Sequence, residues 1–215
     1  MMPKNVLGII YSNSYDASLG ALTARRTMGS VPFGGRYRLI DFALSNFVNC
    51  GITKVGVIAN SNFHSLMDHV GSGSAYDLSK RRSNLTILPP YGGKTFSNYV
   101  ETIYNMHGYI ENSREEYILI SPSNVVTNFD YNSVFDFHSK NNADITLIYK
   151  HGVVPSGYDR PLTLDVDENG KVKQVFIKPE TGDDKVNQFY GSVLMKKDLL
   201  MEEIRTSLSL NQLDV

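Results

Sequence analysis

Apolar residues follow two alternating patterns through the first two thirds of the chain. Short apolar runs rich in β-branched residues predict buried strands, and between them apolar residues recur every three or four positions, as on one face of a helix. This alternation is typical of βαβ units on a parallel sheet. The strands expected from these runs span residues 6–11, 54–59, 85–88, 117–121 and 145–149. The helices expected between them include residues 40–48, 63–70, 99–110 and 131–141.

The pattern changes in the last quarter of the chain. Two alternating runs, residues 162–166 and 172–178, flank residues 167–170, where an Asn-Gly pair favours the tight turn of a β-hairpin. A further strand, residues 191–196, leads into a last amphipathic helix. We therefore expect an α/β fold: a Rossmann-like, mostly parallel doubly wound sheet with an added antiparallel hairpin region, in a single domain over residues 1–215.

Composition narrows the classes of partner. Hydrophobic residues make up 41% of the 215 residues and charged residues 20%, as in an ordinary globular protein. The net charge of −1 gives no overall attraction to nucleic acid or to an anionic membrane, so we expect small ligands. Neither an export signal nor an apolar run of about 20 residues is present, and we expect a cytoplasmic protein.

Reactive side chains outside any motif are few. His107 and His138 lie on the apolar faces of two expected helices, and we expect both at the edge of the core rather than in a site. Cys50 is the only cysteine, which excludes an internal disulfide framework.

Residues 33–46, Phe-Gly-Gly-Arg-Tyr-Arg-Leu-Ile-Asp-Phe-Ala-Leu-Ser-Asn, are the most informative segment. Gly34 and Gly35 permit backbone angles that other residues avoid, and two arginines follow at once. Asp41 falls in the first turn of the expected helix, where a carboxylate suits the helix dipole. On these grounds alone the segment is a glycine turn with solvated arginines and an N-terminal acid.

This segment resembles the F-G-G-[KR]-[YF]-R-[LI]-I-D-F-x-L-S-N signature of ADP-glucose pyrophosphorylases, within the sugar-nucleotide pyrophosphorylase superfamily. The resemblance continues through residues 51–57 to residues 178–179, and so covers nearly the whole chain. It implies a fold of the nucleotide-diphospho-sugar transferase type. The family's C-terminal left-handed β-helix domain is absent from this chain. The resemblance implies a structural role for six signature residues: Gly34, Gly35, Arg36, Arg38, Asp41 and Asn46. Of these, Arg38 and Asp41 are expected to hold the loop onto the helix.

The family's phosphate-binding elements do not match. Its loop after the first strand, G-G-x-G-[ST]-R-L, aligns with Asn13 to Leu19, so that Ser18 stands at the place of the loop arginine. Asp16 would repel a phosphate. The family's lysine before a proline becomes Met28-Gly29. The residues themselves favour a polar surface turn over a phosphate-binding loop.

The metal-binding and sugar-binding elements also depart from the family. Asn124 replaces the metal-binding aspartate, and because Mg²⁺ prefers anionic oxygen, the resemblance implies no metal or other cofactor in this chain, with Mg²⁺ only in a catalytic partner. Asp130 is expected to cap the next helix. Of the family's E-K-P motif only Lys178 and the proline remain, and Lys178 is alternatively an exposed residue ending a strand.

Some binding positions remain as candidates. Asn13, Ser14 and Lys178 are the remnant positions for a substrate. Arg25 and Arg26 lie where some family members contact phosphorylated effectors, and a solvated basic turn is the equal alternative. We assign no catalytic residue.

Loss of catalytic positions on a kept frame resembles the GlgD-type regulatory subunits of this family. That resemblance implies a hetero-oligomer with the catalytic subunit of ADP-glucose pyrophosphorylase (glucose-1-phosphate adenylyltransferase), modulated activity and a role in glycogen biosynthesis. Two alternatives stay open: a weakly active adenylyltransferase, or a sugar-phosphate or nucleotide sensor without an enzyme partner. An unrelated Rossmann-like enzyme is disfavoured because no G-x-G-x-x-G follows the first strand.

Overall fold

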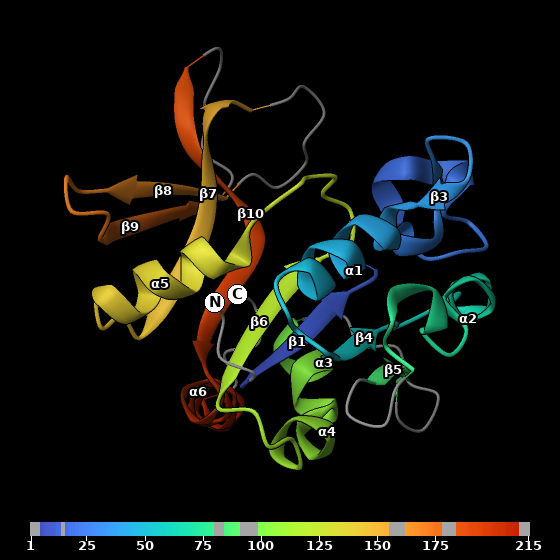
Figure 1. The fold of residues 1–215 in the computed structure, drawn as a ribbon. Coiled ribbons are helices and arrows are strands. Elements are labelled where there is room, and N and C mark those ends of the chain that lie inside the picture. The colour runs from blue at the N-terminus through green and yellow to red at the C-terminus, as the bar shows by residue number, and fades with distance from the viewer. Residues whose placement is uncertain are drawn as a thin grey trace. The chain divides into compact units, whose positions relative to one another are not determined.

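A computed structural model describes residues 5–13, 16–79, 84–90, 99–154, 162–177 and 184–210 (Figure 1). The chain divides into two compact units, Met1–Thr146 with Leu194–Val215 and Leu147–Val193. We describe each unit by itself. Within the described residues, no helix reaches the length and apolarity needed to cross a bilayer.

A parallel sheet forms the centre of the first unit. Its strands lie in the order β5-β4-β1-β6, and each neighbouring pair is parallel. The chain extends the sheet from β1 to β4 and β5 on one side, then adds β6 on the other, which is the reversal of a doubly wound sheet. These strands confirm the predicted ones to within one residue at each end: β1 (Val6–Tyr11), β4 (Lys54–Ile58), β5 (Asn84–Leu88) and β6 (Tyr117–Pro122).

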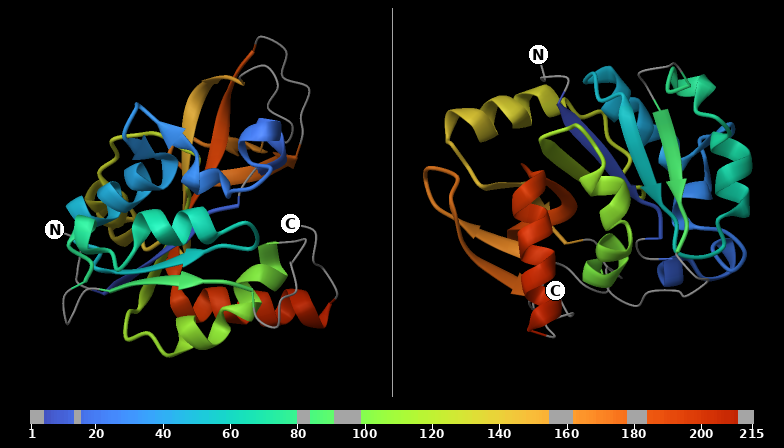
Figure 2. Two further views of the ribbon diagram at one scale, coloured as in Figure 1. Left: turned by 90° about the vertical axis from the view of Figure 1, so that its right-hand side faces the viewer. Right: turned by 90° about the horizontal axis from the view of Figure 1, so that it is seen from below.

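Helices cover both faces of this sheet. On one face α1 (Leu39–Asn49) packs so closely on β1 that a Cβ atom at Gly8 would lie 2.5 Å from the Phe47 ring. On the other face a Cβ atom at Gly56 would lie 2.8 Å from the Tyr109 ring of α4 (His107–Glu111). Figure 2 gives two further views of these layers. The two glycines therefore let both helical layers reach the sheet.

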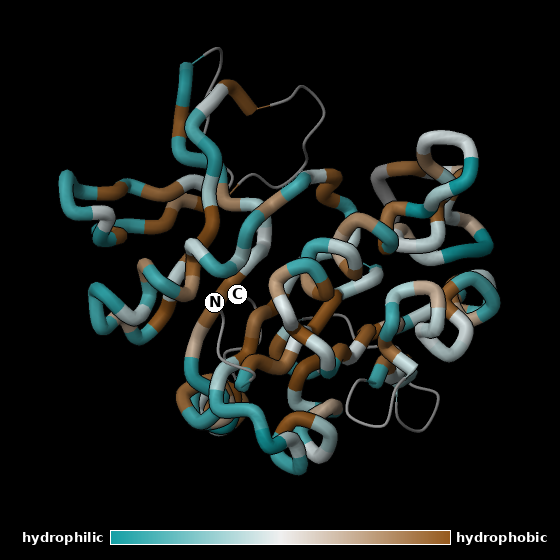
Figure 3. The backbone as a smooth tube through the Cα atoms, in the orientation of Figure 1, coloured by the Kyte–Doolittle hydropathy of each residue, from teal (hydrophilic) through white to brown (hydrophobic). Residues whose placement is uncertain are grey.

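The core of the first unit follows the predicted apolar stripe of α1. Ile40, Leu44 and Phe47 are each fully buried against the strands. Figure 3 shows the hydrophobic strands at the centre of this unit. The unit's remaining helices and short strands are η1 (Asp16–Leu22), η2 (Met28–Ser30), β2 (Pro32–Phe33), β3 (Tyr37–Arg38), α2 (His64–Val70), η3 (Ser74–Tyr76), α3 (Tyr99–Asn105), α5 (Tyr131–Lys140) and α6 (Lys197–Ser209).

The second unit contains the predicted hairpin. Strands β8 (Leu162–Val166) and β9 (Val172–Ile177) are antiparallel, and Gly170 adopts φ 82° in their turn. The rest of the unit's sheet comes from β7 (Ile145–Val153) and β10 (Lys185–Lys196), both of which also have residues in the first unit. β10 begins six residues before the predicted strand and pairs with β8 antiparallel to it.

The single helix predicted over residues 99–110 is wrong. The structure has α3 and α4 instead, separated at Met106, whose backbone (φ −96°, ψ 7°) leaves the helical region. Because α4 starts a new helix, His107 does not continue the inward face of α3. Its Nδ1 bonds to the carbonyl of Tyr104 (2.7 Å), its ring stacks on the Tyr104 ring, and it is exposed. Its expected place at the core edge is therefore wrong.

The apolar run at residues 145–149 forms a strand, as expected, but not a buried one. Ile145 is 46% exposed and Tyr149 is 42% exposed. β7 lies off the main strand order and pairs with β10, so it is not enclosed between neighbouring strands and helical layers as β1 is. A short apolar run indicates a strand without indicating how many of its faces are covered.

We expect Gly8→Ala to destabilise the protein by about 1–3 kcal/mol, because the added methyl group overlaps a Phe47 ring held inside a packed core. Urea unfolding measures the change. Gly108→Ala is the matched control, since a Cβ atom there meets nothing within 4 Å and alanine favours the helix of α4. Equal stability of the Gly8 variant and the parent would contradict the close packing.

His138 gives a second expectation. It is buried, its Nδ1 bonds to Thr146 Oγ1 (2.8 Å), and burial, followed by the positive charge of Lys196, lowers the pKa of its imidazole. The unfolded chain then takes up this proton more readily than the native protein does. Stability contributed by neutral His138 is therefore complete above the unfolded pKa of about 6.5 and is lost as the pH falls below it.

Urea midpoints measured between pH 7.5 and pH 5 test this effect of His138. The parent should lose more stability on acidification than His138→Gln, which cannot titrate. The other histidines are the same in both proteins, so their contributions cancel in the comparison. Parallel pH profiles would show that the native pKa of His138 is not lowered.

Candidate functional site

The candidate site lies at the carboxyl ends of β1 and β6, where the strand order of the sheet reverses. Ser12 directly follows β1 and Ser123 directly follows β6. Their backbones are joined, since Ser123 N donates to Tyr11 O (3.1 Å), and η2 lies against them, since Gly29 N donates to Ser12 O (3.1 Å). Open α/β sheets bind their ligands at this position.

The contact of η2 with the strand ends requires glycine at position 29. A Cβ atom there would lie 2.9 Å from Ser12 Oγ and 3.0 Å from Ser123 Oγ. Both serines are fully buried, and the Ser123 hydroxyl bonds to Ser12 O (3.4 Å). Two hydroxyl groups therefore occupy the space that a side chain at residue 29 would need.

Asn13 links the ends of two strands. Its Oδ1 accepts from Asn60 N (2.6 Å), and its Nδ2 donates to the carbonyl (3.2 Å) and hydroxyl (3.3 Å) of Ser61, just after β4. Both polar atoms of this candidate substrate-binding side chain are thus used within the chain. Two other candidates, Ser14 and Lys178, lie outside the described residues.

Met28 belongs to the core rather than to an open surface. It is 3% exposed and forms a buried cluster with Val31 and Leu39. A lysine at this position would place its ammonium group in an apolar environment, at a high cost in desolvation. Ser18, at the family's loop-arginine position, lies within η1, whose backbone is kinked at Gly20 (φ 50°, ψ −114°).

Asn124, at the family's metal position, is half-buried, and its Oδ1 is buried without a hydrogen-bond partner among the residues that the structure describes. Its neighbours at the strand ends, Ser12 and Ser123, offer neutral hydroxyls. This donor set does not fit Mg²⁺, which prefers carboxylates. No set of three His, Cys, Asp or Glu side chains suited to a metal was found anywhere in the described part of the chain.

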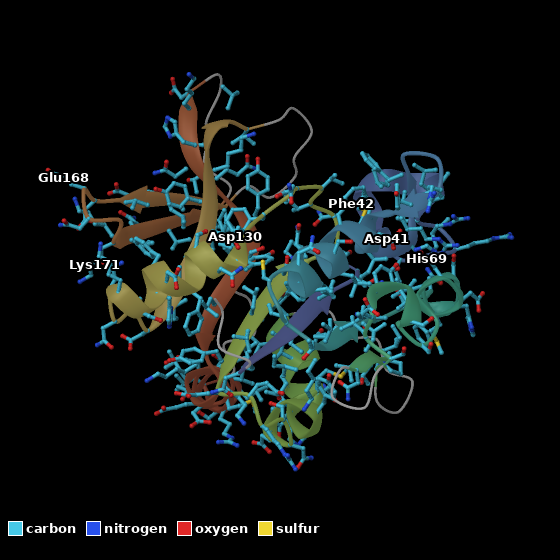
Figure 4. The ribbon with its side chains drawn as sticks, in the orientation of Figure 1. Asp41, Phe42, His69, Asp130, Glu168 and Lys171 are labelled. Atoms are coloured by element: carbon cyan, nitrogen blue, oxygen red, sulfur yellow. The ribbon has the colours of Figure 1, made fainter. Side chains whose placement is uncertain are left out.

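Asp130 caps α5 as predicted, with Oδ1 accepting from Asn132 N (3.0 Å). Hydrogen bonds from the side chain and backbone of Asn132 lower the pKa of the Asp130 carboxyl. Figure 4 labels it beside the start of α5. The Asp130 carboxylate thus has a structural role at the helix end.

The signature segment, residues 33–46, contains a tight turn and a side chain that holds the chain next to the site in place. Gly34 (φ 62°) and Gly35 (φ 85°) form the turn between β2 and β3, and exposed Arg36 lies over the Tyr37 ring (5.3 Å). Asn46 on α1 donates to Thr127 O (2.9 Å) and accepts from the backbone N–H of residue 129 (3.3 Å). It thereby fixes the stretch that follows Asn124.

Asp41 connects three segments. Its Oδ2 accepts from Arg38 N (2.9 Å), and its Oδ1 meets His69 Nε2 (2.6 Å) and the Tyr76 hydroxyl. Figure 4 shows Asp41 and His69 side by side. Burial, and then the bond to Asp41, raise the pKa of Tyr76. The Arg38 guanidinium donates to the carbonyl and hydroxyl (2.7 Å) of Ser65 on α2.

These partners were missed by sequence reasoning. His69, Tyr76 and Ser65 lie 27–35 residues from the groups they contact, in a separate helix and a short 3₁₀ turn. No spacing in the sequence indicates such pairs. Arg25, which is exposed, and Arg26, which is half-buried, follow η1 in the structure.

A sequence profile of the family named Nucleotidyl transferase matches residues 17–199, most of the chain. The chain belongs to the nucleotidyl transferase family. It is 34% identical to a glucose-1-phosphate adenylyltransferase of Clostridium acetobutylicum over 184 residues, which are 84% of this chain and 48% of that enzyme. It is 35% identical over 162 residues to the glycogen biosynthesis protein GlgD of Bacillus subtilis, covering 71% of this chain and 45% of GlgD.

This member of the family spans about half the length of the curated relatives it matches. A crystal structure assigned to a glucose-1-phosphate thymidylyltransferase of Bacillus anthracis, in complex with a sucrose, has the same fold, with a TM-score of 0.71. The alignment covers 91% of this chain and 73% of that one, at 13% identity. It confirms the predicted nucleotidyltransferase-like α/β fold.

We expect Met28→Lys to destabilise the protein by about 2 kcal/mol or more, because the ammonium group would be buried among apolar side chains. Met67→Lys is the matched control, since Met67 is 45% exposed on α2 and its replacement should change stability by less than about 0.5 kcal/mol. Urea unfolding of both variants measures the difference. If the two lysines cost the same, residue 28 faces solvent and the burial argument is wrong.

Proposed function

We propose that this chain is the regulatory, non-catalytic subunit of a glucose-1-phosphate adenylyltransferase, which forms ADP-glucose and pyrophosphate from ATP and glucose 1-phosphate. In this proposal it pairs with the catalytic subunit of ADP-glucose pyrophosphorylase and modulates that subunit in glycogen biosynthesis. Mg²⁺ is held by the catalytic partner.

The environment of residue 28 carries the proposal. In the enzymes that the chain resembles, a lysine at this place faces the phosphates. Here Met28 is buried against Val31 and Leu39. A thioether enclosed in the core supplies no charge to the phosphates, whose negative charge must be neutralised during nucleotidyl transfer.

The ends of β1 and β6 support the same conclusion. Asn124 brings a neutral amide to the position of the family's metal-binding aspartate, and Asn13 uses its polar atoms on Asn60 and Ser61. The frame around them is intact, because Asn46 and Asp41 hold the neighbouring segments in place. A kept scaffold in which residues 28 and 124 bring no charge suits a protein that acts through its contacts.

The relatives support the process in which we place the chain. One is named glucose-1-phosphate adenylyltransferase and another glycogen biosynthesis protein GlgD, at similar identity to this chain. Because the chain matches the two relatives at similar identity, this comparison supports the fold that they share and does not choose between their roles. The choice of the regulatory role over catalysis rests on residues 28 and 124.

Regulation of this kind needs no chemistry in the chain. A coupling free energy of about 1–3 kcal/mol across a subunit interface changes a partner's affinity by about 5–150-fold. Arg25 is exposed and Arg26 half-buried, so our proposal includes a phosphorylated effector bound at this pair. The effector and the catalytic partner would then bias the same assembled state.

The test is pyrophosphate release from ATP and glucose 1-phosphate with Mg²⁺. Three samples are compared: the full-length protein alone, the catalytic subunit from the same cell alone, and both together. We expect no turnover by the protein alone. In the mixture we expect the partner's apparent affinity for substrate or effector to rise about fivefold or more.

Two results contradict the proposal. One is turnover by the purified protein alone that falls in Lys178→Ala, which would make the chain a weakly active adenylyltransferase. The other is a mixture that behaves as the sum of its parts although both proteins are folded. Binding of a sugar phosphate with no effect on the partner would instead support a sensor.

A further inference from the structure

Two tyrosines stack at the carboxyl end of β1. Tyr11 is the last residue of β1 and Tyr99 is the first residue of α3, and their ring centroids lie 4.7 Å apart with an interplanar angle of 38°. Both residues are half-buried. A tilted aromatic pair at this distance is a favourable contact, so the two rings hold each other in place.

The strand geometry explains why Tyr11 reaches α3. Side chains alternate along β1, so Ile9 and Tyr11 share one face and Gly8 lies on the other. Gly8 faces Phe47 of α1, whereas a Cβ atom at Gly56 would lie 3.0 Å from Ile9 and 2.8 Å from Tyr109 of α4. Tyr11 therefore projects on the face covered by α4, and there it meets Tyr99.

Both faces of the end of β1 are thus occupied by the chain itself. On the α1 face η2 packs on Ser12, with Gly29 in contact. On the opposite face stand the rings of Tyr11 and Tyr99. The end of β1 next to the reversal of strand order is the position at which an open α/β sheet accepts a nucleotide.

We propose that the Tyr11–Tyr99 pair is a specificity determinant that excludes a nucleoside from the carboxyl end of β1. A nucleobase binds by presenting a flat face to a flat or apolar surface, and here each tyrosine already presents a face to the other. In this arrangement the pair takes the place of a base at the end of β1. The inference concerns the chain alone and does not depend on a catalytic partner.

The exclusion has a physical basis in competition within the chain. To admit a base between the rings, the protein must separate Tyr99 from Tyr11 and lose their contact, or move the start of α3. A ligand therefore binds there only if the free energy of its own contacts with the protein exceeds the free energy lost when the two rings separate. With Met28 in the core and Asn124 neutral, the described residues nearby offer the phosphates little in return.

Calorimetric titration with ATP and Mg²⁺ tests the proposal on the whole chain. The parent and Tyr99→Phe, which keeps the stacked ring, should bind ATP with a Kd weaker than about 1 mM. Tyr99→Ala, and more so Tyr11→Val with Tyr99→Ala, should bind at least about tenfold more tightly. Tyr104→Ala is the matched control, because it removes a stacked ring from the same helix away from β1.

Fluorotyrosine at position 11 reports where ATP binds. Its resonance should shift on ATP addition in Tyr99→Ala and stay constant in the parent. Three results would overturn the proposal: saturable ATP binding by the parent that shifts Tyr11, no gain in affinity in any opened variant, or a gain without a shift at Tyr11. If the alanine variants do not fold, the parent and Tyr99→Phe still decide it, since ATP binding that shifts Tyr11 in either one refutes exclusion.

Partner activation provides a separate readout. If the parent excludes ATP but leaves the catalytic subunit unchanged, the proposed regulatory function fails and the exclusion stands. If the parent binds ATP at Tyr11 and still activates the partner, the exclusion fails and the regulatory function stands.

Discussion

The buried carboxylate of Asp41 is the interaction on which the arrangement of the first unit depends. It accepts hydrogen bonds from the backbone of Arg38 and from the side chains of His69 and Tyr76, and so it joins α1 to two segments that follow β4. A buried carboxylate is tolerated only when such donors surround it. The same helix carries Asn46, which fixes the chain after β6. The position of α1 therefore sets the position of the stretch that contains Asn124.

Sequence patterns predicted those parts of the fold that depend on residues close together in the chain. The four parallel strands, the apolar stripe of α1 and the cap at Asp130 each depend on residues within a few positions of one another. The hairpin of β8 and β9 was predicted for the same reason, because an Asn-Gly pair between alternating runs specifies a turn. The break at Met106 and the exposure of β7 depend on what packs against each segment, and the sequence does not state that.

The candidate site shows the same division. Resemblance to a family indicated which positions had changed, such as residues 18, 28 and 124. It did not indicate that Met28 lies inside the core, that Asn13 is held by Asn60 and Ser61, or that Tyr11 meets Tyr99. These facts concern residues brought together from 47 to 88 positions apart or enclosed by other segments. Only the structure distinguishes a position that has lost a reactive group from a position whose new side chain is packed or hydrogen-bonded within the chain.

The contact of Gly29 with the hydroxyls of Ser12 and Ser123 has an evolutionary consequence. A larger residue at position 29 is compatible with this backbone only if the side chains of both serines move or are replaced, because each hydroxyl lies within about 3 Å of the missing Cβ atom. A single substitution that adds a side chain at position 29 is therefore opposed at once by overlap within the core. Residues 12, 29 and 123 therefore constrain one another, and a change at position 29 needs an accommodating change at the two serines.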